Sequence, residues 1–156
     1  MKTDLLTVKY AMQKLLKETF EGPGKNEIYF TDPGPGAGLL ETIERINARE
    51  ASMILPSSQA SIAAHVHHTL YHLQVMNAGL LNEDRQVDWS LSWKIHEVDE
   101  GTWQAFKSQL KEEYDSFNET LEKIEWTEQQ TLYASAALAH CAYHLGSLKQ
   151  LIAQLP

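Results

Sequence analysis

The sequence is poor in the features that mark secreted, membrane-spanning and nucleic-acid-binding proteins. Cys141 is the single cysteine among 156 residues, so no internal disulfide can form, which suits a reducing cytosol. No uncharged apolar run approaches the roughly 18 residues of a membrane span, and the first residues lack the pattern of a signal peptide. The formal charge of −8 opposes binding to phosphate backbones. We therefore expect a cytoplasmic protein with neither a membrane nor a nucleic acid as partner.

The length and the apolar periodicity predict a single all-α domain over residues 1–156. Four long amphipathic segments and a minor one account for most of the chain, and no segment alternates convincingly like a strand. Such a pattern is typical of a four-helix bundle. We expect the helices at about 3–20, 38–52 (the minor one), 56–82 and 100–124, with the last helix opening at Thr127.

Two helix starts have recognisable capping residues. Pro56-Ser57-Ser58 is typical of a helix start and predicts the beginning of the second long helix. Thr127 followed three residues later by Gln130 has the form of a capping box for the last helix.

Residues 21–38 form a long connection that holds five of the eight glycines and three of the five prolines. At most, a short strand is expected within it at residues 27–30. The run from Gly34 to Gly38 has neither of the spacings that phosphate-binding loops use, and no strong strand leads into it. We interpret it as an ordinary loop.

Histidine is the informative residue type, because six of the seven histidines fall in two short windows. The second long helix carries His65, His67, His68 and His72, and the last helix carries His140 and His144. His140 and His144 are four residues apart, so their rings lie on one face of the helix, the face that also looks toward the core. Two buried neutral imidazoles need partners for their ring nitrogens, and a divalent metal is a strong one.

The second long helix can complete such a site, since His65, His68 and His72 share one stripe whereas His67 points elsewhere. Three imidazoles would leave coordination positions open for water, as in catalytic zinc sites. Periodicity does not decide which histidine of this helix takes part. Measured from the apolar stripe, His65 and His72 lie nearer the core than His68. The alternative for the whole set is a group of core histidines that hydrogen-bond one another.

The same windows resemble the DinB/YfiT-like metalloenzyme superfamily. The segment Ser61-Ile62-Ala63-Ala64-His65-Val66-His67-His68 is similar to that family's second helix, and His140-Cys141-Ala142-Tyr143-His144-Leu145-Gly146 is similar to its later HxxxH segment. Asp88-Trp89-Ser90-Leu91-Ser92-Trp93 is similar to a segment of one branch of the family.

The resemblance implies a bundle of the DinB/YfiT-like type and a divalent metal, zinc or nickel, held by His68, His140 and His144. It also implies a metal-dependent hydrolase or thiol transferase, the latter using a small thiol cofactor, and a homodimer. The small-molecule substrate is unknown, and no carboxylate in the sequence is identified as a general base. The alternative function is a non-catalytic module in which the ion joins two helices.

Other candidate sites are weaker. His96-Glu97 begins like the HExxH motif of metalloproteases but lacks its second histidine, and no histidine has a glutamate three residues before it, as di-iron bundles require. Cys141 lies about 100° around the helix from His140 and is expected to be a packed, inert thiol. Trp89 and Trp93 are expected to pack on the domain, with a pocket-lining role as the alternative.

Overall fold

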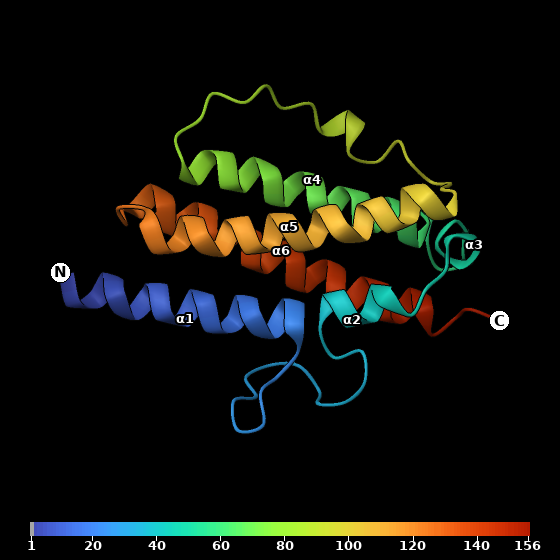
Figure 1. Cartoon of the computed structure of the whole chain (residues 1–156), viewed down its shortest axis with the longest axis horizontal. Coiled ribbons are helices and arrows are strands. Elements are labelled where there is room, and N and C mark those ends of the chain that lie inside the picture. The colour runs from blue at the N-terminus through green and yellow to red at the C-terminus, as the bar shows by residue number, and fades with distance from the viewer. Residues whose placement is uncertain (1) are drawn as a thin grey trace.

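Four long helices pack side by side along the length of the molecule (Figure 1). The computed structural model describes residues 2–156, with side chains from residue 6 onward. The long helices are α1 (Lys2–Glu21), α4 (Ile62–Leu80), α5 (Glu100–Lys123) and α6 (Glu128–Ile152). Helix α4 contacts α5 and α6, and α1 contacts the same two helices from the other side. The all-α class is therefore confirmed, and every helix in the described range is too short or too polar to cross a bilayer.

The core lies between these helices and is made largely of aliphatic and aromatic side chains. Trp103 and Phe117 of α5, Leu73 of α4 and Leu148 of α6 are fully buried. Their spacing follows the helical repeat, so each long helix turns one apolar face inward and a charged or polar face outward. Burial of this kind, at about 25 cal/mol per Å² of apolar surface, is the main force that holds the helices together.

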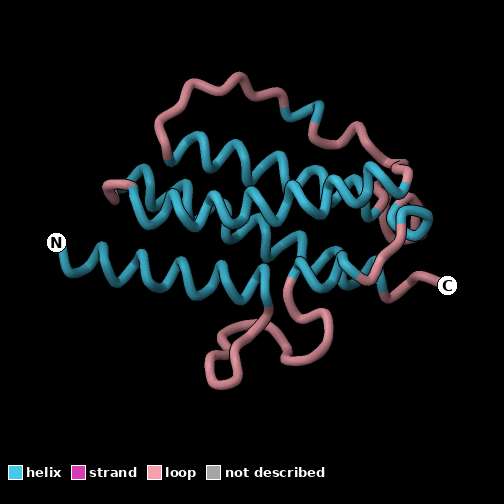
Figure 2. The backbone as a smooth tube through the Cα atoms, in the orientation of Figure 1, coloured by secondary structure: helices cyan, strands magenta, loops and turns pink. Residues whose placement is uncertain are grey.

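The connection between α1 and α2 (Leu39–Glu44) leaves the body of the molecule and returns to the same point (Figure 2). Gly22, with φ +85°, ends α1, and the backbone of Gly38 comes so close that a Cβ there would lie 2.3 Å from the Gly22 nitrogen. Glycine is required at both positions for this reason.

Residues 27–30, where at most a short strand was expected, form none, and the only pairing in this connection is an isolated bridge between Gly24 and Glu27. The backbone N–H groups of Tyr29, Phe30 and Thr31 instead donate to the carboxylate of Glu18 in α1. A buried carboxylate satisfies these donors, so no second strand is needed.

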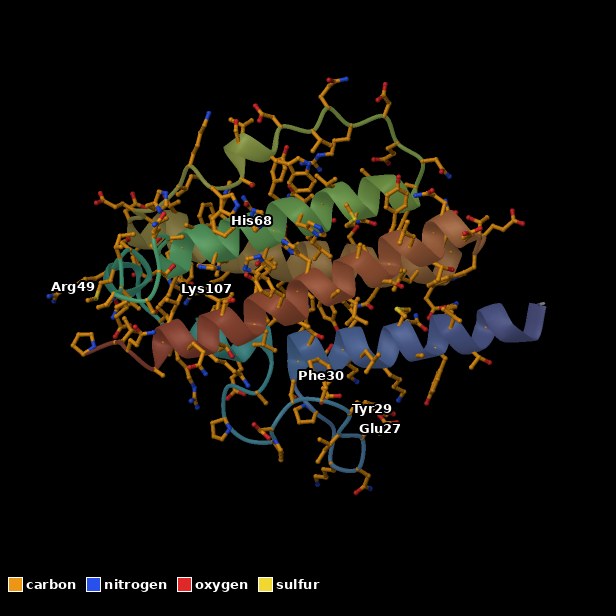
Figure 3. All side chains as sticks on the ribbon, turned by 180° about the vertical axis from the view of Figure 1, so that it is seen from behind. Glu27, Tyr29, Phe30, Arg49, His68 and Lys107 are labelled. Atoms are coloured by element: carbon orange, nitrogen blue, oxygen red, sulfur yellow. The ribbon has the colours of Figure 1, made fainter. Side chains whose placement is uncertain are left out.

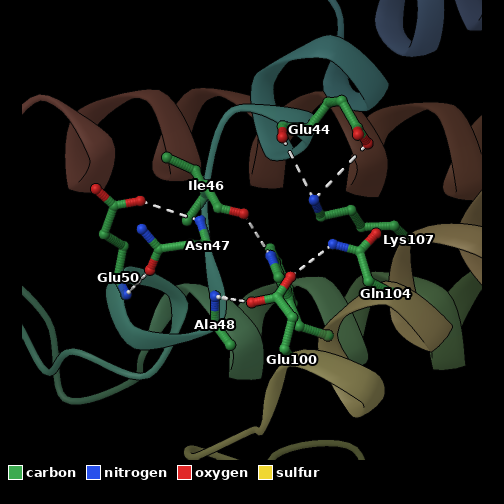
Figure 4. A network of polar contacts seen from close by, with 9 residues as sticks. Glu44, Ile46, Asn47, Ala48, Glu50, Glu100, Gln104 and Lys107 are labelled. Atoms are coloured by element: carbon green, nitrogen blue, oxygen red, sulfur yellow. Dashed lines mark hydrogen bonds and ion pairs between the residues drawn. The ribbon is translucent and has the colours of Figure 1, made fainter.

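The minor helix predicted at 38–52 is two short helices, α2 and α3 (Ala48–Ala51). Asn47 interrupts the helix because its side chain accepts from the Glu50 N–H while the Glu50 carboxylate accepts from the Asn47 N–H, each at 3.0 Å. This capping box starts a new helix after a turn. Figure 4 shows it beside the Glu100 carboxylate, which accepts from the Ala48 N–H at 3.2 Å and so ties α3 to α5.

A second set of contacts ties α5 to the segment before α3. The Trp103 indole N–H donates to the carbonyl of Ile46 at 2.5 Å. The Lys107 ammonium donates to the carbonyl of Glu44 at 3.3 Å, and Figure 4 shows this pair. Both side chains are buried, so these bonds satisfy polar groups that water does not reach.

Helix α4 begins later than predicted. Ser61, not the Pro56-Ser57-Ser58 segment, is the N-cap, and its hydroxyl accepts from the Ala64 N–H at 3.1 Å. The Ser58 hydroxyl binds the backbone of Ala60 instead and closes a turn before the helix. Helices α5 and α6 begin close to where the sequence predicts, with Asp99 and Thr127 as N-caps. Gln130 completes the predicted capping box only in part, because its side chain bonds the Thr127 hydroxyl.

We predict that the Glu18 carboxylate contributes measurably to stability through the connection that it anchors. Burial alone would raise its pKa, but the bonds from Thr31, Phe30 and Tyr29 outweigh that effect and leave the pKa lowered. Glu18→Gln should therefore cost roughly 2 kcal/mol in the free energy of unfolding at pH 7, measured by urea denaturation. The carboxylate's contribution is present above the unfolded-state pKa near 4.5 and is lost as the pH falls through the lower folded-state value.

The matched control for Glu18→Gln is Thr31→Val, which removes only the hydroxyl donor of the same cluster. It should cost less than Glu18→Gln. Equal stability of the wild type and Glu18→Gln at pH 7 would contradict the prediction.

Candidate metal centre

Helices α4 and α6 run antiparallel, and this direction brings the two histidine windows together. His65 of α4 lies against His144 of α6, whereas His72, two turns further along α4, lies against His140. Further along still, an added Cβ at Gly79 would touch the Tyr133 ring. The pairing therefore runs in opposite directions along the two helices.

The three histidines named by the family resemblance come together. One ring nitrogen from each of His68, His140 and His144 lies within 4.8 Å of the other two, and no other group of this kind occurs among the described residues. The Nε2 atoms of His68 and His140 are 3.0 Å apart. His144 is buried, while His68 and His140 are half-buried. These three imidazoles could hold a metal ion.

The connection between α4 and α5 arches over α4 in Figure 1 and lies above His68 in Figure 3, and two of its residues contact the His68 ring. Residues 81–91 are exposed, but Ser92 is fully buried, and the Trp93 ring stacks on the His68 ring with centroids 4.0 Å apart. A short 3-10 helix (Trp89–Leu91), capped by Asp88, precedes these two residues. Trp93 packs on the His68 ring, as the packing prediction expects, whereas Trp89 remains half-exposed beside His72.

Ser92 fixes the protonation pattern of His68. Its hydroxyl donates to the carbonyl of Trp89 at 2.7 Å, and its oxygen lies 2.8 Å from His68 Nδ1. A hydroxyl has a single proton, so the bond to His68 requires Nδ1–H to donate. His68 Nε2 is then the nitrogen with the free lone pair, and it is the atom that faces His140. Sequence reasoning did not single out Ser92, because only its contact across the fold reveals the role.

The position of His140 Nε2, 3.0 Å from His68 Nε2, is compatible with a cation bound by both atoms. With the lone pair of His68 opposite, His140 Nε2 must donate a proton in the metal-free cluster, and a cation bound by both nitrogens would replace that proton. The other nitrogen of this ring, Nδ1, is buried without a hydrogen-bond partner in the described structure. A cation at Nε2 would not reach this Nδ1 atom, so Nδ1 lacks a partner with or without the ion.

The other histidines surround the three rather than joining them. His65 Nδ1 lies 3.0 Å from His144 Nδ1, and the His72 ring stacks on the His140 ring at 3.6 Å. His67 points away, as predicted, and bonds the carbonyl of Ser92 at 3.0 Å. The preference of the apolar periodicity for His65 or His72 over His68 does not match this grouping, because the overlying Ser92 and Trp93 make the His68 side of α4 an interior face.

The cluster is a set of neutral bases near pH 7. Burial, followed by the charge that neighbouring imidazoles would carry, lowers the pKa of His144 to about 3 and that of His68 and His72 to about 4. The same causes hold the pKa of His140 far below its usual value, and burial lowers that of His65. Neutral imidazoles are the form that binds metal ions. Cys141 is buried beside them, and burial raises the pKa of its thiol to about 12, so it is an inert packing residue as predicted.

No family model, curated protein or solved structure matches this chain. The site is therefore supported by its own geometry.

We predict that the imidazole cluster makes the metal-free protein sensitive to acid. The unfolded chain, whose histidines titrate near 6.5, binds protons that the folded cluster excludes, so the free energy of unfolding falls as the pH drops from 6.5 toward about 4. His72→Phe keeps a flat ring against His140 but removes one titrating group. The substitution should make the free energy of unfolding depend less steeply on pH, by at most about 1.4 kcal/mol per pH unit. Urea denaturation in the presence of a chelator measures it.

Tyr71→Phe is the matched control for His72→Phe, since it removes the hydroxyl that accepts from the Asp88 N–H and leaves the imidazoles in place. Its pH dependence should equal that of the wild type. If His72→Phe also equals the wild type, the cluster is not the source of the acid sensitivity.

The bond from His68 to Ser92 gives a second prediction. Ser92→Ala should free His68 to exchange between its two neutral tautomers, whereas Ser92→Thr keeps a hydroxyl and should keep the Nδ1–H form. Ring ¹⁵N chemical shifts at pH 7 distinguish a protonated nitrogen from a lone pair. A pure Nδ1–H form in Ser92→Ala would show that the serine does not set the tautomer.

Proposed function

We propose that His68, His140 and His144 bind a divalent metal ion, zinc or nickel, and that the chain is a metal-dependent hydrolase or thiol transferase of the DinB/YfiT-like type. The observation that supports this most directly is the convergence of three ring nitrogens within 4.8 Å, from two helices. Imidazole nitrogen suits zinc and nickel. The family assignment rests on the resemblance of the two histidine windows.

The ligand set favours a catalytic ion over a purely structural one. Three protein ligands leave a coordination position open in a tetrahedral site, whereas structural zinc sites have four. All three ligands are neutral, so the ion would keep its full double charge. When bound, such an ion supplies Lewis acidity, which polarises a carbonyl and brings the pKa of bound water to about 7.

The chain's own residues would orient the ligands and limit access of water. Ser92 holds His68 in the tautomer whose Nε2 lone pair is free, and the Trp93 ring covers the outer face of His68. His65 contacts His144 through the Nδ1 atoms of both rings, an arrangement that can hold His144 in one orientation. No carboxylate belongs to the group of ligands in the described residues, so the chain offers no carboxylate base at the ligands themselves.

Metal content tests the proposal. Untagged protein, incubated with zinc or nickel and then desalted, should retain about one ion per chain by elemental analysis. His68→Ala, His140→Ala and His144→Ala should each weaken binding by about a hundredfold or more, since each removes a ligand. His67→Ala, which removes the histidine that points away, is the control and should bind as the wild type does. Wild-type metal content in all three ligand variants would overturn the site.

Removal of the metal distinguishes two functions: an enzyme, and a non-catalytic module in which the ion only joins α4 to α6. An active centre predicts a modest fall in melting temperature and an exchangeable water on the ion, detected by water relaxation with a paramagnetic substitute such as cobalt. A structural ion predicts a large fall and no exchangeable water. The second result would retain the metal site and refute the catalytic function.

A further inference from the structure

A pocket of about 460 Å³ lies beside the candidate metal centre, between the C-terminal half of α6 and the turn that precedes α4. His65 lines it, and the same ring contacts His144 at 3.0 Å between Nδ1 atoms. A single imidazole therefore separates a molecule in this pocket from one of the three proposed ligands. The volume is within the range of small-molecule sites, roughly 300–1,000 Å³.

The lining of the pocket is polar but carries no charged side chain. The Tyr143 phenol and the Gln150 side-chain amide supply both donors and acceptors, whereas the hydroxyls of the three lining serines already bond Gln154, Ala60 and the Tyr143 carbonyl. The Tyr143 hydroxyl and the Gln150 amide bond no other described residue, so they remain available to a ligand. A charged ligand would lose water here without meeting an opposite charge, and that loss is costly.

The polar groups of the pocket suit a molecule rich in hydroxyls. A hydroxyl both donates and accepts, as do the serine and tyrosine hydroxyls that line the pocket. The Tyr143 ring is 69% exposed and adds an apolar surface at the rim, against which the C–H face of a sugar-sized ring could pack.

The glycine at position 146 of α6 also supports ligand binding in the pocket. Glycine inside a helix costs about 0.5–1 kcal/mol relative to alanine. The helical glycine at position 79 has a packing reason, since a Cβ there would lie 3.0 Å from the Tyr133 ring. A Cβ at Gly146 would meet nothing within 4 Å, so the fold does not require the glycine. Gly146 lines the pocket, and the missing side chain leaves that space open.

We propose that this pocket binds a neutral, hydroxyl-rich small molecule of sugar size. We further propose, in a step that rests on the proposed function, that molecules of this class are substrates of the metal centre. The pocket itself is defined by side chains of the folded chain, so its binding does not require the metal.

Three hexoses of the same size but different charge test the proposal: glucose, glucuronate and glucosamine. Each is titrated into chelator-treated ¹⁵N-labelled protein, and the amide shifts of Ser147 and Gln150 are followed. Glucose should saturate these shifts and bind about tenfold or more tightly than either charged relative. No saturation by glucose would overturn the proposal. Tighter binding of glucosamine would also overturn it, because it would show that attraction to the acidic protein governs binding.

Gly146→Leu places a side chain at the wall of the pocket, and its Cβ would meet no heavy atom within 4 Å beyond its chain neighbours and its own helix backbone. It should keep or raise the melting temperature and weaken glucose binding about tenfold or more. Gly101→Leu, which adds the same side chain to an exposed helical glycine outside the pocket, is the control and should bind glucose as the wild type does. Unchanged glucose binding in Gly146→Leu would place the ligand elsewhere and refute the proposal.

Metal content, measured in the same samples, keeps the two proposals apart. Glucose binding by a chain that takes up no zinc would support the pocket and refute the metal centre, whereas zinc uptake without glucose binding would do the reverse. If both bind, zinc-loaded protein incubated with glucose should show a shift at the His65 ring. No such shift would refute the assignment of the pocket to the metal centre.

Discussion

The site depends on the antiparallel contact between α4 and α6. Each helix repeats a histidine about once per turn, and because the two helices run in opposite directions, His68 meets His140 while His65 meets His144. If the two helices ran parallel, the same histidines would lie at different heights along the contact between them. The contact is held by apolar side chains that flank the imidazoles, such as Leu73 and Leu148, both fully buried. The core thus fixes the relative position of nitrogen atoms on separate helices, which no local interaction could do.

The histidine cluster does not by itself favour the stability of the fold. Five imidazoles lie together with their pKa values depressed, and the Nδ1 atoms of His72 and His140 are buried without partners in the described structure. Apolar side chains of similar volume would pack there without unsatisfied polar atoms. A cation between the Nε2 atoms of His68 and His140 would replace the proton that these two atoms share in the metal-free cluster, so the geometry that forms a hydrogen bond between core histidines also fits a metal ion.

Much of the fold could be predicted from the sequence, because long helices with regular apolar spacing depend on local pattern. Two local predictions failed. The Glu18 carboxylate binds the backbone where at most a short strand was expected, and Ser61, not the Pro56-Ser57-Ser58 segment, caps α4. The spacing of His140 and His144 predicted a shared face correctly. Spacing could not select His68, since the apolar stripe of α4 favours His65 and His72, and what makes His68 interior is a connection more than twenty residues away.

That connection links the candidate centre to a segment with few other attachments. The Ser92 hydroxyl donates to Trp89 and accepts from His68, so one oxygen joins the short 3-10 helix to a proposed ligand. The carbonyl of the same residue holds His67, and Trp93 covers the His68 ring. The exposed residues before Ser92 contribute little to the core. Their conformation and the tautomer of His68 are therefore coupled through the buried Ser92. A substitution that loosens the turn at Trp89, whose ring packs on His72, would alter His68 without replacing any of the three proposed ligands.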